Sequence, residues 1–153
     1  MQLVGEIDFL GQSKEQIIET ILDMNKNALK KNGELLQTLF FKKDSDKWYI
    51  AFVENESQET KDKFWSDILH SVPHEIKSIV LVSDMTLTDL EANKKKDALM
   101  LHYLDDKGTV IVKQASYVKK FLKGIVYENV ADRDPSVLFH YLEPIAETYR
   151  VRS

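Results

Sequence analysis

The chain has 153 residues, a formal net charge of −4 and no cysteine. This length suits one domain that buries roughly 70% of the surface its unfolded chain would expose, and the lack of cysteine excludes disulfides, thiolate nucleophiles and cysteine-ligated metals. The negative charge and the shortage of arginine, present only at Arg133, Arg150 and Arg152, argue against a nucleic-acid partner, because arginine is the side chain best suited to phosphate and base recognition.

Residues 1–12 follow neither a helical nor a strand period, so a short strand and a packed extended arm both stay open. A helix is expected over 13–32, because Ser13 and Gln16 have the spacing of a capping box. Asn32-Gly33 supplies a stop for this helix. Apolar residues recur between these ends at helical spacing: Ile17, Ile18, Ile21, Leu22, Ala28 and Leu29.

A β-hairpin is expected over 35–54, with its turn at Asp44-Ser45-Asp46. Its second strand carries Trp48, Ile50 and Phe52 on one face and Tyr49, Ala51 and Val53 on the other, which indicates burial on both faces. A second helix is expected over 57–72, and Pro73 ends it. Its apolar stripe consists of Phe64, Trp65, Ile68, Leu69 and Val72.

The segment 76–118 is expected to supply the later half of the sheet. It begins with a buried strand at 76–82, continues as a polar loop over 83–97, and ends in a hairpin of 98–104 and 109–118. Gly108 is expected to take a positive φ in the turn of that hairpin.

After an irregular link that has room for a short strand at 125–127, Asp134-Pro135 begins a last helix over 134–150. Pro144 is expected to kink or split this helix.

Together these elements predict one α+β domain over 1–153. Its sheet is expected to be largely antiparallel, with five or six strands and two or three packed helices. No apolar run approaches the ~18 residues of a membrane span, and no basic leader precedes an apolar stretch. We therefore expect a soluble, cytoplasmic protein without a membrane partner.

Three features of the central segment carry a resemblance. They are the strand Ile79-Val80-Leu81-Val82, the acidic and polar stretch from Ser83, and Asp97-Ala98-Leu99 at the entry to a hairpin. In these the chain resembles a group of small uncharacterised prokaryotic α+β proteins with a helix, a hairpin, a helix and three further strands. It departs from them at Met85 and Thr86, where an aromatic residue often follows the acidic one. The resemblance implies a fold and no activity.

No motif for catalysis, a metal or a cofactor can be written on this chain. All five glycines are isolated, which excludes a P-loop and a dinucleotide fingerprint. His70 and His74 are four residues apart, but Pro73 should end the helix between them, so we expect no metal site. His102 and His140 are interpreted as structural histidines.

The best candidate for a binding site is the polar segment after the central strand, with Asp84, Thr86, Asp89 and Asp97. Paired carboxylates can bind a divalent cation or act as general acid and base. A solvated connection needs the same residues, however, and that interpretation is the stronger one.

Lysines alternate with aromatic residues at Lys42-Lys43 and Lys119-Lys120, near Phe41, Tyr117 and Phe121. This composition suits a platform for single-stranded nucleic acid. We favour the alternative, in which the aromatic rings point into the core. Tyr141 and Tyr149 are expected to be available for a partner surface.

These observations predict a non-enzymatic interaction or accessory protein that acts through a protein surface. A protein partner or self-association as a homodimer is expected. The alternative is a small hydrolase-like or cation-binding domain that uses the acidic segment.

Overall fold

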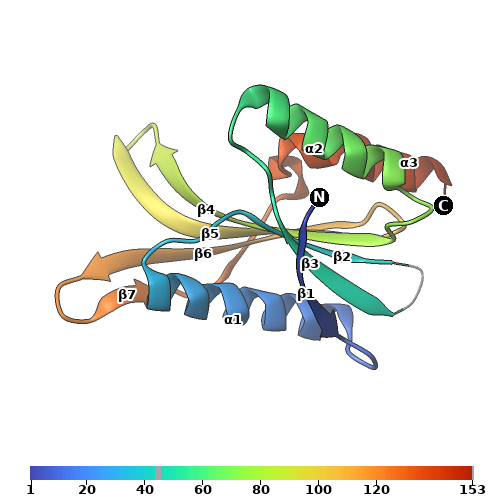
Figure 1. Cartoon of the computed structure of the whole chain (residues 1–153). Helices are drawn as coiled ribbons and strands as arrows, with labels where there is room; N and C mark the ends of the chain where they lie inside the picture. The colour runs from blue at the N-terminus through green and yellow to red at the C-terminus, as the bar shows by residue number, and fades with distance from the viewer. Residues whose placement is uncertain (44–45, 153) are drawn as a thin grey trace.

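The computed structural model describes residues 1–43 and 46–152, which form an eight-stranded antiparallel sheet with three α-helices (Figure 1). The strand order is β1-β3-β2-β4-β5-β6-β7, and β8 pairs with β6. The elements are β1 (Leu3–Asp8), α1 (Lys14–Asn32), β2 (Thr38–Lys42), β3 (Lys47–Phe52), α2 (Gln58–Ser71), β4 (Ser78–Asp89), β5 (Lys94–Leu104), β6 (Val110–Lys120), β7 (Gly124–Tyr127), β8 (Ala131–Arg133), the 3₁₀ turns η1 (Pro135–Val137) and η2 (His140–Leu142), and α3 (Glu143–Arg152).

The curved sheet separates two layers of helix. Helix α1 covers one face, and α2 and α3 lie side by side on the other (Figure 1). Because side chains alternate along a strand, Val80 and Val82 of β4 join the apolar cluster under α1, whereas Ile79 and Leu81 join the cluster under α2 and α3. The expected α+β class is confirmed, and so is burial on both faces of the sheet.

Local sequence signals position the first two helices. Ser13 caps α1, and its hydroxyl and the Gln16 side chain complete the expected capping box, while Gly33 ends the helix at φ 77°. Helix α2 ends at Ser71, before Pro73. Among the helices that the structure describes, none is long and apolar enough to cross a membrane.

Two expectations about the sheet were wrong. The sheet has eight strands rather than five or six, since short strands form at both places where one was left open, β1 within 1–12 and β7 at 124–127, and β8 was not expected. The polar loop expected over 83–97 does not exist as a loop, because β4 continues to Asp89 and β5 begins at Lys94. Of the turn expected at 44–46, Asp44 and Ser45 lie outside the described residues.

The helix expected over 134–150 is not continuous, and its break does not fall at Pro144, because two 3₁₀ turns precede α3, which begins only at Glu143. Asp134 accepts a hydrogen bond from the Ser136 amide at 2.8 Å and caps η1. The break falls at Leu138 and Phe139, whose ψ angles of 137° and 130° are extended. Pro144 lies in the first turn of α3, where its missing N–H breaks no helical hydrogen bond.

Gly108, in the β5–β6 turn, leaves no room for a side chain beside α3. Its φ of +81° confirms the expected turn, and a Cβ there would meet Arg150 Cγ at 2.3 Å and the Ala146 carbonyl at 3.1 Å. Gly33 has a similar φ of +77°, but a Cβ added there would meet no described atom within 4 Å. We expect Gly108→Ala to lower the free energy of unfolding by about 2–4 kcal/mol and Gly33→Ala by only about 1 kcal/mol.

Urea unfolding of both variants measures this difference. Since the two glycines share the same backbone strain, the excess cost at Gly108 reports the close approach of α3. Equal losses in the two variants would contradict that contact.

Candidate functional site

The four candidate residues of the acidic segment do not converge on one site. Asp84, Thr86 and Asp97 lie on the face of the sheet that α1 covers, and Asp89 alternates to the other face at the end of β4. The Asp89 carboxylate accepts hydrogen bonds from the amides of Glu91 and Ala92, at 3.0 and 3.2 Å, and so closes the β4–β5 turn.

The other two carboxylates are engaged inside the sheet. Asp84 accepts a hydrogen bond from the Tyr117 hydroxyl at 2.6 Å, and Asp97 accepts one from the Thr86 hydroxyl at 2.9 Å. Burial and the Asp84 carboxylate raise the pKa of Tyr117, so the phenol stays a donor. Over residues 1–43 and 46–152, no group of three or more histidine, aspartate or glutamate side chains is placed to hold a metal ion. These hydrogen bonds show that Asp84 and Asp97 join neighbouring parts of the sheet.

His102 is the one histidine among the described residues that is buried, with 3% of its surface exposed. Its Nδ1 accepts a hydrogen bond from the Phe139 amide at 3.4 Å. Burial lowers the pKa of His102 to about 4. His70 lies in the last turn of α2, and His74 follows that helix in the link to β4, so the two are not on one helix face.

The interpretation of the alternating lysines and aromatics holds for two of the three rings. Phe41 and Tyr117 are buried, as expected. Phe121 is not, because 92% of its surface is exposed. The expectation for the C-terminal tyrosines was also half wrong, since Tyr149 is fully buried and only Tyr141 is partly accessible.

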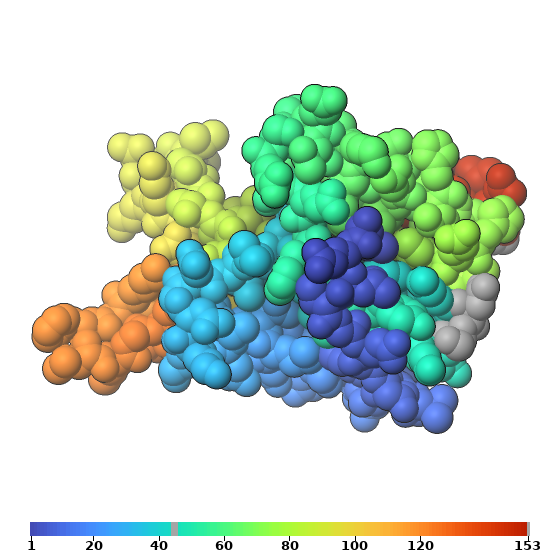
Figure 2. Space-filling view, viewed as in Figure 1, coloured from blue at the N-terminus to red at the C-terminus, as the bar shows by residue number. Residues whose placement is uncertain are grey.

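Phe121 belongs to an unusual turn between β6 and β7, which we name the β6–β7 tip and define as residues 119–124. It projects from the body of the molecule (orange in Figure 2). Leu122 beside Phe121 is 91% exposed and has a φ of 70°, in the left-handed region that leucine rarely adopts. No ion pair joins the flanking lysines Lys119, Lys120 and Lys123 to any carboxylate that the structure describes.

A concave, acidic groove lies between α1 and the β6–β8 side of the sheet. We name it the α1 groove; it has a volume of about 490 Å³. Its apolar lining consists of Ile18, Leu22, Ile111 and Val130, and its acidic side chains are Glu15, Glu19 and Asp23. The acids are spaced by four residues, which places them along one face of α1.

The two lysines of the α1 groove are already engaged. Lys26 lies over the Tyr127 ring, with its Nζ 4.9 Å from the ring centroid, and Lys113 pairs with Asp132. The three acids form no ion pair with a basic side chain of the described residues. The groove therefore presents an excess of negative charge around an apolar floor.

Comparisons with protein-family models, with curated proteins and with solved structures find no match to this chain. The resemblance to small prokaryotic α+β proteins therefore stays a prediction.

Proposed function

We propose that this protein is a non-enzymatic interaction module that acts as a homodimer, in which the β6–β7 tip of each copy enters the α1 groove of the other. The observation that carries the proposal is the tip itself. Phe121 and Leu122 are almost fully exposed between three lysines. Neighbouring apolar side chains held out in this way are typical of contact surfaces.

The backbone at Leu122 supports a role in binding rather than in stability. A non-glycine residue in the left-handed region costs about 1–2 kcal/mol, and glycine would avoid that cost. Strain of this kind is found where a surrounding structure or a partner makes use of it. A leucine at this position can bury its side chain in a partner's groove, and that apolar burial offsets the strain. Glycine has no side chain to bury there.

Strand β7 supplies a way for two copies to meet. Within residues 1–43 and 46–152 it is the last strand of the sheet and pairs only with β6, so its outer edge carries backbone groups that no other described strand pairs. Such an edge readily pairs with another strand. Two β7 edges related by a two-fold axis pair antiparallel, which closes the assembly at two copies.

The same pairing brings each tip to the partner's groove. In an antiparallel pair, the start of one strand lies beside the end of the other. The tip immediately precedes β7, and Val130 of the α1 groove follows shortly after it. One two-fold axis therefore places the tip of each copy beside the α1 groove of the other copy.

Charge and polarity match across this contact. The tip offers two apolar side chains and three lysines, and the groove offers an apolar floor and three carboxylates. Complementary charges of this kind fix the register of an interface and disfavour other partners.

The test is charge reversal on each side, measured by sedimentation equilibrium between micromolar and millimolar chain concentrations. We expect the unmodified protein to form a species of twice 17.8 kDa. The tip variant Lys119→Glu, Lys120→Glu, Lys123→Glu and the groove variant Glu15→Lys, Glu19→Lys, Asp23→Lys should each raise the dimer dissociation constant by at least about 30-fold.

An equimolar mixture of the two variants should regain the dimer, because each reversed tip then meets a reversed groove. The matched control is Lys94→Glu with Lys95→Glu on the β4–β5 hairpin, which should leave the dimer intact. A protein that stays monomeric at all concentrations, or a mixture that does not associate, overturns the proposal.

A further inference from the structure

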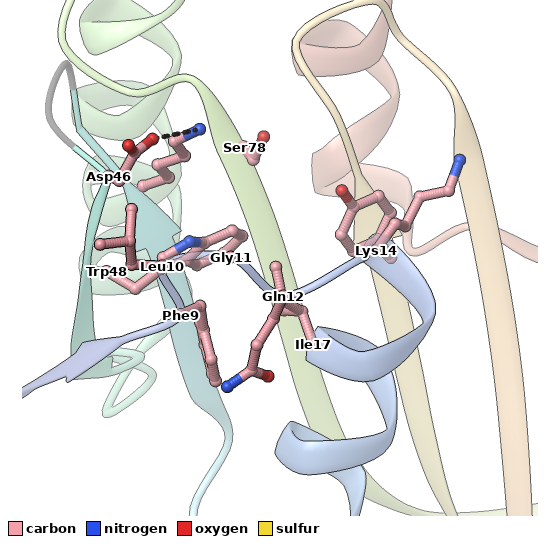
Figure 3. Close-up of a pocket in the computed structure, with 11 residues that line it drawn as sticks. Phe9, Leu10, Gly11, Gln12, Lys14, Ile17, Asp46, Trp48 and Ser78 are labelled. Carbon is pink, nitrogen blue, oxygen red and sulfur yellow. Dashed lines mark ion pairs between the residues drawn. The ribbon is translucent and has the colours of Figure 1, made fainter.

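A second concave region lies at the N-terminal end of α1, beneath the link from β1 to that helix (Figure 3). The cavity has a volume of about 280 Å³. The link folds over it from one side, α1 begins at its rim, and the ends of β2, β3, β4 and β5 form its floor. This volume is close to the lower end of the range for small-molecule pockets.

Part of the lining is apolar and rigid. Phe9 packs edge-on against Trp48, with ring centroids 5.6 Å apart and an angle of 76° between the planes. Both rings are buried, and Ile17 lies beside them in the same cluster. A planar or branched apolar group of a ligand would therefore meet a preformed surface.

Two hydroxyl groups in the lining have no protein partner. Ser78 and Tyr103 are 7% and 6% exposed, yet among the described residues neither hydroxyl makes a hydrogen bond, and neither is sealed away from the cavity. Because both hydroxyls open into the same cavity, they are free to hydrogen-bond the polar atoms of a ligand there.

Among the charged side chains that line the cavity, two are lysines and one is an aspartate. Lys14 stands at the first position of α1, where the helix dipole is also positive, and no ion pair occupies it among the described residues. Lys42 is paired with Asp46 at 3.3 Å, drawn as the dashed line in Figure 3, so its charge is balanced. Burial, with smaller contributions from Asp105, Asp106 and Glu15, raises the pKa of Tyr103 to about 12, so its hydroxyl is a donor at neutral pH.

We infer that this cavity binds a small organic acid that has one carboxylate and one compact apolar group. The carboxylate accepts hydrogen bonds from the hydroxyls of Tyr103 and Ser78 and lies near Lys14. The apolar group packs on Phe9 and Trp48. The inference does not rest on the proposed dimer, because the cavity shares no lining residue with the β6–β7 tip or the α1 groove.

Phenylacetate is the probe, and phenylacetamide is the neutral probe of the same shape. Titration is followed by amide and indole chemical shifts in ¹H–¹⁵N NMR spectra of the full chain. We expect saturable shifts at Gly11, Lys14 and the Trp48 indole, with a dissociation constant on the order of 1 mM for phenylacetate. Phenylacetamide should bind at least about 10-fold more weakly.

Three variants test the assigned atoms. Tyr103→Phe and Ser78→Ala should each weaken phenylacetate binding by about 10-fold, and the surface change Lys14→Gln by about 5-fold. Tyr141→Phe, at a tyrosine outside the cavity, is the matched control and should bind as the unmodified protein does.

Well-dispersed spectra of each variant establish that it folds, and Lys14→Gln tests the site without touching the core. Shifts that do not saturate up to the solubility limit of phenylacetate overturn the inference. So do equal affinities for the acid and the amide, or variants that bind phenylacetate as tightly as the unmodified protein.

Discussion

Tyr149→Ala is expected to lower the free energy of unfolding by about 3–5 kcal/mol. Tyr149 lies on α3 with none of its surface exposed, in the cluster that joins α3 to α2 and to β4. Its hydroxyl donates a hydrogen bond to the Ile76 carbonyl at 2.6 Å, just before β4 begins. Truncation leaves a cavity beneath α3 and an unpaired carbonyl, so two separate costs combine.

Tyr149→Phe separates these two costs. It keeps the ring and removes only the hydroxyl, so we expect a loss of about 1–2 kcal/mol. Urea unfolding followed by circular dichroism measures both variants. Tyr141→Ala is the control at a less buried tyrosine of the same segment. It should lower the free energy of unfolding by much less than Tyr149→Ala does. If Tyr149→Ala unfolds within about 1 kcal/mol of the unmodified protein, α3 is not anchored as the structure has it.

The second large effect concerns pH. His102 has a pKa of about 4 in the folded protein against 6.5 for an unperturbed histidine, because burial disfavours the charged form. The unfolded chain therefore binds more protons than the folded chain below pH 6.5. The stability that neutral His102 contributes is present above pH 6.5 and is lost as the pH falls toward 4. The total loss in the free energy of unfolding is about 3 kcal/mol.

His102→Asn is the variant that isolates this effect. Asparagine keeps an acceptor for the Phe139 amide and does not titrate. Between pH 7 and pH 4.5, the variant should therefore lose about 2–3 kcal/mol less of its free energy of unfolding than the unmodified protein loses. His74→Asn, at an exposed histidine, should keep the unmodified slope. Parallel pH profiles for the unmodified protein and His102→Asn would contradict the buried neutral histidine.

Signals that depend on a few neighbouring residues could be predicted from the sequence. The capping box at Ser13 and the glycine turn at Gly108 appear where they were predicted, and Asp134 caps a helical turn as predicted, although that turn is a short 3₁₀ turn. Each of these is decided by local backbone geometry and hydrogen bonds, so distant contacts do not override it.

The expected loop over 83–97 failed for an identifiable reason. Polar residues were interpreted as a connection, although Met85 and Leu87 alternate with polar residues in the manner of a strand with one face toward solvent. Residues of β8 are exposed at all three positions and offer no pattern that could have predicted a strand.

The proposed surfaces could not be found from sequence for a different reason. Each joins segments that are far apart in the chain, such as α1 with β6 and Val130, or the β1–α1 link with Ser78 and Tyr103. Phe121 shows the same limit. Nothing in Lys119-Lys120-Phe121 indicates whether the ring packs inward or points to solvent. The outcome depends on whether β6 still packs against other elements where it ends.

Helix α1 separates the cavity from the β6–β7 tip by its whole length, about 28 Å for 19 residues. The cavity lies over strands that are buried on both faces, whereas the tip belongs to a hairpin end with few packed neighbours. Amide hydrogens in these two regions should thus exchange through different openings, near-global at Tyr103 and local at Leu122. Ordering of the tip within one copy therefore need not perturb the cavity of that same copy.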